Sequence, residues 1–315
     1  MRIGRAAGVT DTGRRRLRNE DAFICEPPLF AVADGMGGAR AGEVAARLAA
    51  AALEEAGAET KGEQGVTAMI EEANRRIWER ALADPATAGM GTTVTAALVD
   101  TESGTVAIGH VGDSRAYRLR EGSLEQLTSD HSLVAELVSS GVLTPEEAER
   151  HPQRSAITRA LGTEPTVDVE VLTIAGEPGD LYLICSDGLP TMLADDAIAA
   201  ALETAEREPM AAAEALVAAA NRQGGEDNIT VVLFELVEGD APAGEATEVS
   251  IAVVDRAESV PSEAAAPTPP TDADADADAG VQHHGAGPGG RLAALVLVVA
   301  VLVIGALILY WGISR

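Results

Sequence analysis

The fold is decided by the stretch TTVTAALVDTESGTVAIGHVGDSRAYRL, residues 92–119. It contains three short runs rich in β-branched and apolar residues, Thr92–Val99, Thr105–Val111 and Arg115–Leu119, and these runs predict strands. Only turns separate them, the first at Asp100–Gly104. Because a parallel crossover needs a dozen residues or more, these strands must pair antiparallel.

The same kind of pattern extends over residues 1–237, where strand-like runs alternate with helical ones. Further strands are predicted at Ile3–Val9, Ala22–Cys25, Leu29–Ala33, Val167–Ile174, Asp180–Cys185 and Ile229–Val237. Helices are predicted at Ala41–Ala56, Gln64–Ala83, Ser132–Ser140, Pro145–Arg150, Asp195–Leu202 and Pro209–Arg222. Helices of this length beside antiparallel strands predict an α+β domain with helices layered on the sheets.

Charge limits the classes of partner. The 315 residues include 50 acidic and 23 basic ones, a net charge of -27, and residues 1–237 hold 39 acidic and 20 basic residues of that total. A balance this negative argues against nucleic acid as a partner, because that binding depends on clustered Lys and Arg. The two cysteines, Cys25 and Cys185, provide no disulfide framework and fit a reducing compartment.

The end of the chain predicts a membrane anchor. Residues 292–311, LAALVLVVAVLVIGALILYW, carry no charge, and as a helix they would cross the roughly 30 Å hydrocarbon core of a bilayer. We therefore expect 291–315 to form a single transmembrane helix with a short tail. Since no signal peptide precedes the domain, we expect a single-pass protein of the cell membrane with its large domain in the cytoplasm.

Residues 238–290 separate this predicted anchor from the domain. They are rich in Ala, Pro and acidic residues, which predicts a disordered linker with a root-mean-square span of roughly 40 Å. The alternating run Asp272–Asp278 could suggest a calcium site, but it lacks the glycine turn and the terminal Glu of a calcium loop.

Acidic residues gather where the predicted strands begin or end. The five clusters are Glu20-Asp21, Asp34, Asp113, Asp187 and Asp227. Antiparallel neighbours of this kind bring their carboxylates to one edge, where they repel one another unless a cation lies among them. Oxygen ligands without nearby Cys or His favour Mg²⁺ or Mn²⁺. Each Asp also fits an ordinary turn, but five at strand edges favour a metal site.

The glycine-rich segment DGMGG, residues 34–38, has another interpretation, because such a turn before a helix can bind a dinucleotide. The spacing does not fit, since the third glycine of that pattern would fall on Arg40. The phosphate-binding pattern that ends in Gly-Lys-Ser/Thr is not met either. The carbonyl of Gly35 is instead free to approach a metal.

Nine short motifs occur in order along residues 1–237: TDTGRRR (10–16), NED (19–21), DGMGG (34–38), GTT (91–93), GDSR (112–115), DH (130–131), RALG (159–162), SDG (186–188) and DN (227–228). Together they resemble the metal-dependent serine/threonine protein phosphatases of type 2C, in their bacterial form. The linker and the predicted span lie outside the resemblance.

The resemblance implies a layered α-β-β-α sandwich of two antiparallel sheets flanked by helices. It also implies a centre with two divalent metal ions, Mn²⁺ or Mg²⁺, and a third, weaker site. Asp34 would bridge both metals, and the Gly35 carbonyl would bind the second. Glu20 and Asp21 would serve the second metal, largely through water.

The other ligands implied by the resemblance come from later in the chain. Asp187 and Asp227 would bind the first metal, and Asp113 with Asp187 would hold the third. Asn228 would support these ligands without binding a metal itself.

Arg16 would hold the substrate phosphate, which its planar fork suits, so that Arg16 and Asp34 are the expected catalytic residues. Met36 departs from many eukaryotic relatives, which have at this position a His that is a candidate proton donor. His131 is expected to be a structural turn residue. The segment His151–Arg154 resembles the bacterial flap beside the active site.

The expected activity is hydrolysis of phospho-Ser and phospho-Thr in proteins by a metal-bridging hydroxide, which two ions generate at neutral pH. Expected partners are phosphorylated proteins, namely Ser/Thr kinases and their substrates. One alternative is a catalytically silent module that binds phosphoproteins, which the complete ligand set disfavours. Another is a phosphatase of a sigma-factor regulator, a branch that usually carries sensor domains.

Overall fold

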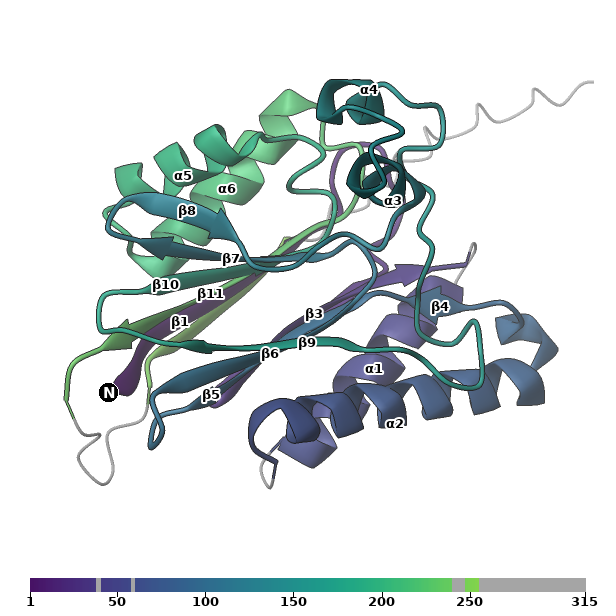
Figure 1. Cartoon of the computed structure of the whole chain (residues 1–315), viewed down its shortest axis with the longest axis horizontal. Helices are drawn as coiled ribbons and strands as arrows, with labels where there is room; N and C mark the ends of the chain where they lie inside the picture. The colour runs from purple at the N-terminus through teal and green to yellow at the C-terminus, as the bar shows by residue number, and fades with distance from the viewer. Residues whose placement is uncertain (38–40, 58–59, 240–246, 255–315) are drawn as a thin grey trace, which may run out of the picture. The chain divides into compact units, whose positions relative to one another are not determined.

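Two β-sheets lie face to face in the structure, a computed structural model that describes residues 1–37, 41–57, 60–239 and 247–254 (Figure 1). The first sheet has the order β12 (Val249–Val254), β1 (Arg2–Asp11), β11 (Ile229–Val237), β10 (Leu181–Cys185), β7 (Arg115–Arg120), β8 (Ser123–Gln126). The second has the order β2 (Asp21–Glu26), β3 (Leu29–Met36), β5 (Val94–Asp100), β6 (Thr105–Val111), β9 (Glu170–Ala175), with β4 (Gly91–Thr92) paired to β3.

Helices cover the outer face of each sheet. On the second sheet lie α1 (Ala41–Gly57) and α2 (Gly62–Ala83), and on the first lie α5 (Asp195–Thr204) and α6 (Pro209–Gln223) (Figure 1). Two short helices, α3 (Leu133–Ser139) and α4 (Pro145–Glu149), lie together at one end of the sandwich (Figure 1), and the 3₁₀ turn η1 (Pro85–Thr87) follows α2. This arrangement confirms the predicted α-β-β-α layering within the described residues.

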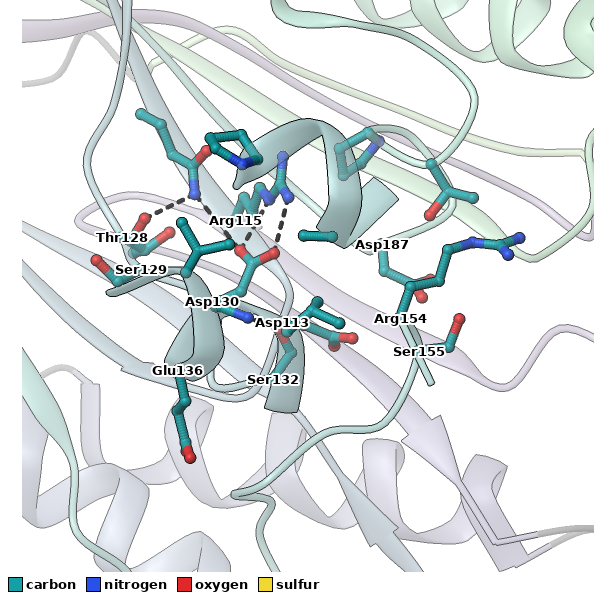
Figure 2. A pocket seen from close by; sticks show the side chains of 18 of the residues that line it. Asp113, Arg115, Thr128, Ser129, Asp130, Ser132, Glu136, Arg154, Ser155 and Asp187 are labelled. Atoms are coloured by element: carbon teal, nitrogen blue, oxygen red, sulfur yellow. Dashed lines mark hydrogen bonds and ion pairs between the residues drawn. The ribbon is translucent and has the colours of Figure 1, made fainter. Parts of the chain in front are cut away.

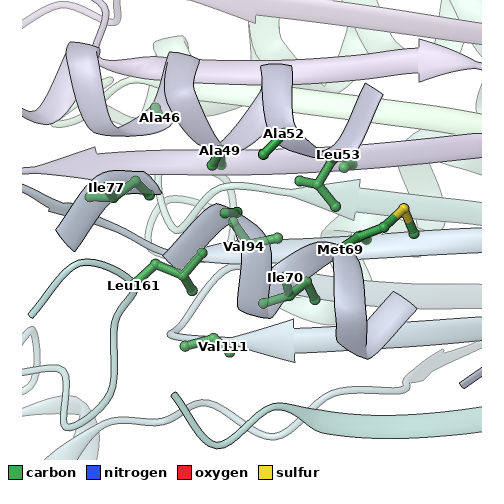
Figure 3. Packing of buried hydrophobic residues seen from close by; sticks show 14 of the residues in the cluster. Ala46, Ala49, Ala52, Leu53, Met69, Ile70, Ile77, Val94, Val111 and Leu161 are labelled. Atoms are coloured by element: carbon green, nitrogen blue, oxygen red, sulfur yellow. The ribbon is translucent and has the colours of Figure 1, made fainter. Parts of the chain in front are cut away.

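Packing between the layers follows from residue size and spacing. Helix α1 presents Ala46, Ala49 and Ala52 to the second sheet, a helical spacing of small side chains that lets the helix approach closely (Figure 3). Between the sheets the rings of Phe30 and Phe234 stack with their centroids 4.1 Å apart. Because both faces of each sheet are covered, the central strands read as continuous apolar runs rather than as alternating ones.

The strands and helices predicted within residues 1–237 are all present, with ends shifted by a few residues, but the strand predicted at Thr92–Val99 is interrupted at Thr93. The Thr93 amide donates a 2.9 Å hydrogen bond to the Asp34 carbonyl, and its hydroxyl lies 2.6 Å from the Ser114 hydroxyl. Thr93 therefore ties three parts of the chain together at the end of β3. Strand β8 was not predicted.

Strand β12 corrects the prediction for residues 238–290. The run Val249–Val254 is not disordered but pairs in parallel with Ala6–Asp11 of β1, so one pair of the first sheet is not antiparallel. The acidic, Pro-rich composition of the long segment hid a short β-branched run, and the edge of β1 was open to receive it. The last strand of the sandwich that the structure describes therefore ends at Val254.

The predicted membrane span at 291–315 lies outside the described residues, as do 240–246 and 255–290 of the predicted linker. Within the part of the chain that the structure describes, no helix combines the length and the apolar character needed to cross a bilayer.

Candidate active site

Strands β2 and β3 place two carboxylates opposite each other, because Asp21 pairs in register with Asp34. The Thr230 hydroxyl, from the other sheet, donates a 2.6 Å hydrogen bond to Oδ2 of Asp21. The backbone of Asp34 is fixed by its carbonyl, which accepts from the Thr92 hydroxyl at 2.8 Å. Both carboxylates are therefore held by the strands rather than by loops.

Gly35 allows the backbone at Glu20 to approach the end of β3 closely. A Cβ at this position would lie 2.3 Å from the Gly42 carbonyl oxygen of α1 and 2.5 Å from the carbonyl oxygen of Glu20. Only glycine fits between these backbones. The absence of a side chain keeps the first turn of α1 and the segment before β2 against the end of β3.

The remaining carboxylates come from turns of both sheets. Asp113 follows β6, Asp187 follows β10, and Asp227 precedes β11. Burial raises the pKa of Asp34 well above its ordinary value, and the nearby charges of Asp21, Asp187, Asp113 and Asp227 raise it further. The carboxyl group of Asp34 therefore lies near four others, which come from segments of both sheets.

The crowding affects the whole group. Burial, followed by the charge of Asp187, raises the pKa of Asp21 and of Asp113 to about 7 each, and burial with the charge of Asp227 raises the pKa of Asp187 to about 6. Burial also raises the pKa of Glu20, although Arg16 opposes this shift. Several negative charges therefore share a region that lacks enough positive charge to balance them.

Two carboxylate oxygens show that this group suits a cation. Oδ1 of Asp21 and Oδ1 of Asp187 are buried and have no hydrogen-bond donor among the described residues. Buried acceptors normally have partners, and a hard divalent ion would supply one. Across the described ranges no three His, Cys, Asp or Glu side chains are grouped closely enough to hold a metal ion as they stand.

Arg16 lies beside this centre. Its Nη2 donates to Oδ2 of Asp227 at 2.6 Å, and about half of its side chain, 52%, remains exposed. The hydrogen bond to Asp227 raises the pKa of Arg16 above its ordinary value, which keeps the guanidinium charged. A group held at one end by a carboxylate and open to solvent can receive a phosphate dianion.

Asn228 holds the loop that carries Arg16. Its Oδ1 accepts from the Glu20 amide at 2.9 Å, and its Nδ2 donates to the carbonyls of Thr12 at 2.9 Å and Arg18 at 2.8 Å. One buried side chain thus joins both ends of the loop. The resemblance had assigned Asn228 a supporting role, and the structure shows which atoms it contacts.

Thr230 was not predicted as a site residue, although it contacts Asp21 directly. A polar residue in the apolar run of β11 is the only signal that could have indicated it. His131 behaves as the turn residue that was expected, because its Nδ1 accepts from the Gly112 amide at 3.1 Å and its Nε2 lies 3.2 Å from Glu170. Both ring nitrogens are engaged, so the structure gives no support to His131 as a proton donor.

A cavity of about 1100 Å³ adjoins the carboxylates (Figure 2). Asp113 and Asp187 line it together with residues of α3 and α4, and Arg154 of the predicted flap also lines it. A bidentate ion pair between Arg115 and Asp130, with N to O distances of 2.8 and 2.7 Å, supports its wall. The cavity offers room beside Asp113 and Asp187 for a molecule larger than a phosphate ion.

Comparisons with known proteins agree with this geometry. The chain is 41% identical over 244 residues to the serine/threonine protein phosphatase PstP of Mycobacterium tuberculosis, covering 75% of this chain and 46% of that protein. It therefore spans about half the length of this relative. It is also 40% identical over 238 residues to the serine/threonine phosphatase stp of Listeria monocytogenes, covering 72% of this chain and 93% of that protein.

Solved structures give the same result. The structure of PstP/Ppp from Mycobacterium tuberculosis matches with a TM-score of 0.70 and 39% identity, over 75% of this chain and all of that one. The catalytic domain of PstP in complex with two manganese ions matches with a TM-score of 0.68 and 38% identity, over 75% and 99%. The family profile described as "Protein phosphatase 2C" matches residues 13–223. The chain therefore belongs to the protein phosphatase 2C family.

Proposed function

We propose that this protein is a phosphatase that hydrolyses phospho-Ser and phospho-Thr in proteins with the help of two divalent ions, Mn²⁺ or Mg²⁺. The observation that carries the proposal is the meeting of carboxylates from both sheets beside a half-exposed Arg16. Among the residues that the structure describes, buried oxygens of Asp21 and Asp187 have no hydrogen-bond donor. The two manganese ions in the related PstP catalytic domain support the same assignment.

The metal ligands would be divided between the sheets. Asp34 would contact both ions, with the Gly35 carbonyl, Glu20 and Asp21 on the side of the second ion. When bound, the two ions would lower the pKa of a water molecule and so provide hydroxide near neutral pH. The carboxylates would keep the ions fixed relative to the substrate.

The first ion would be held by Asp187 and Asp227, and a third, weaker ion by Asp113 and Asp187. Arg16 would orient the phosphate by two parallel hydrogen bonds, because its fork matches two phosphate oxygens. The contact of Arg16 with Asp227 would position the guanidinium before substrate arrives. Met36 cannot donate a proton, so protonation of the leaving group would rest on another donor.

The cellular setting is also part of the proposal. The uncharged run at 292–311 would anchor the protein in the cell membrane with the catalytic domain in the cytoplasm, where Ser/Thr kinases and their substrates would be its partners. A variant that lacks 291–315 is expected to move from the membrane fraction to the soluble fraction and to keep its turnover. Retention of that variant in membranes would contradict the anchor.

The catalytic proposal is tested by phosphate release from a phosphothreonine peptide in Mn²⁺ and in EDTA. We expect turnover only with the metal, and a loss of about a hundredfold or more in Asp34→Asn. Asp100→Asn is the matched control, because Asp100 is outside the carboxylate group, at the end of β5, where it accepts from the Glu102 amide at 2.9 Å. Undiminished turnover of wild type in EDTA, or of Asp34→Asn in Mn²⁺, would overturn the mechanism.

A further inference from the structure

The loop that carries Arg16, beside the proposed metal site, is unusually rich in positive charge. Four of the 23 basic residues of the chain lie within residues 14–18, whose sequence is RRRLR, while residues 1–237 as a whole hold about twice as many acidic residues as basic ones. All five positions are exposed. A dense positive patch therefore lies next to the place where a substrate phosphate would bind, on a domain that is otherwise negative.

The backbone of this loop is fixed at several points. The amides of Arg14 and Arg15 donate to the Gly225 carbonyl at 2.7 and 3.2 Å. The Gly13 amide donates to Oδ1 of Asp11 at 2.7 Å, and Asn228 holds the loop at both ends, as described above. The side chains are thus presented from a rigid support, which lowers the entropic cost of binding a partner.

The side chains of Arg15, Leu17 and Arg18 are exposed to solvent. Leu17 is 97% exposed, so it contributes almost nothing to a core. In the sequence, Arg15 precedes Arg16 and Arg18 follows it by two positions, and both are exposed. The guanidinium of Arg16 itself is held by Asp227. Positive side chains held around a phosphate-binding residue favour anionic groups on the same ligand.

We infer that Arg15 and Arg18 select substrates in which acidic groups flank the phosphorylated residue. This inference rests on the proposed phosphatase function and adds its substrate class. The flanking anion is either a carboxylate of Asp or Glu or a second phosphate, since the guanidinium groups recognise both. A phosphoprotein is favoured over an anionic lipid surface as the ligand of this loop. The reason is that Nη2 of Arg16, in the same loop, lies 2.6 Å from Oδ2 of Asp227 in the proposed catalytic centre.

The test compares four phosphothreonine peptides whose flanking residues are Glu, a second phosphothreonine, Ala or Lys. The measured quantity is kcat/KM for each peptide divided by kcat/KM for p-nitrophenyl phosphate, which has no flanks. At low salt, we expect wild type to prefer the anionic flanks over Ala by about three- to tenfold and to disfavour Lys. The preference should decline at about 0.5 M salt because exposed charges are screened.

The double variant Arg15→Ala/Arg18→Ala should lose the preference. Its matched control is Arg75→Ala/Arg80→Ala, which changes the net charge equally on α2, where these arginines pair with Glu79 and Asp84. The control should keep the preference. A preference for Glu alone or for the second phosphate alone would identify which anion the loop selects.

Three results would distinguish failure of the proposed function from failure of this inference alone. Absence of Mn²⁺-dependent turnover of every substrate would overturn the proposed function. Turnover without a flank preference, or with one that survives in Arg15→Ala/Arg18→Ala, would overturn only the inference. The inference alone would also fail if that variant lost binding to phosphatidylserine vesicles but kept its peptide preference, since the loop would then serve a membrane surface.

Discussion

Asp21 of β2 and Asp34 of β3 lie directly opposite each other in the sheet, and each is surrounded by further carboxylates. Like charges directly opposite on neighbouring strands destabilise a sheet. The fold therefore holds an arrangement that is unfavourable without a cation and favourable with one. Metal binding and stability of the domain should be linked for this reason.

The first prediction concerns pH and stability without metal. The pKa of Asp21 is raised to about 7 in the folded protein, from about 4 when unfolded. The folded protein therefore favours the protonated carboxyl group of Asp21. The stability that this group contributes is fully present below about pH 4 and is lost as the pH rises through 7. In EDTA at pH 8, Asp21→Asn should melt above wild type by roughly 2 °C or more, and the difference should shrink at pH 5.

Addition of Mn²⁺ supplies the control for this comparison. The ion should raise the melting temperature of wild type at pH 8 more than that of Asp21→Asn, because the carboxylate then has a cation as its partner. A difference in EDTA that stays constant between pH 5 and pH 8 would contradict the assigned burial of this carboxylate.

The second prediction concerns Arg16. Replacement by Lys keeps the charge but removes the fork, so kcat/KM for phosphopeptides should fall by about ten- to a hundredfold. Binding of Mn²⁺, measured by calorimetry, should stay within about threefold of wild type, because no metal ligand is changed. Equal activity of Arg16→Lys and wild type would show that bidentate contact with phosphate is not required.

The third prediction concerns Asn228. Asn228→Asp keeps the size and the acceptor for the Glu20 amide but removes the two donors to Thr12 and Arg18. We expect a loss of about 2 kcal/mol in unfolding free energy, together with a several-fold rise in KM, since Arg16 would no longer be held in place. Ser103→Ala, in an exposed turn, is a suitable control. An unchanged KM in a folded Asn228→Asp protein would argue against the positioning role.

The fourth prediction concerns β12. Chains that end at residue 258 and at residue 239 differ by this strand, so the comparison isolates its contribution. The shorter chain should melt a few degrees lower, because Ala252 no longer packs against the core under α6 and the edge of β1 is open. Phosphatase turnover per folded molecule should be similar in both. Identical melting temperatures would mean that β12 adds no stability.

Much of the fold could be predicted from local sequence, because turns as short as Asp100–Gly104 allow only antiparallel neighbours. The gathering of the carboxylates could also be predicted, since Asp34, Asp187 and Asp227 stand at strand ends where the chain order leaves few arrangements. The site contacts of Thr230 and Asn228 could not, because they depend on the register between β1, β11 and the loop from Thr12 to Glu20.

Strand β12 was missed for a different reason. Its six residues lie in a segment whose average composition is acidic and rich in Ala and Pro, and composition averaged over 53 residues conceals a short apolar run. Its pairing depends on an open edge of β1 about 240 residues earlier in the sequence. Such long-range strand additions are decided by tertiary contacts rather than by local propensity.

The central claim is that carboxylates from both sheets form one metal centre around Asp34. Calorimetric titration of the full chain with Mn²⁺ tests it most directly, with Asp34→Asn and Asp113→Asn beside wild type. We predict two tight sites in wild type, loss of both in Asp34→Asn, and two tight sites retained in Asp113→Asn. Wild-type Mn²⁺ binding by a folded Asp34→Asn protein would contradict the account.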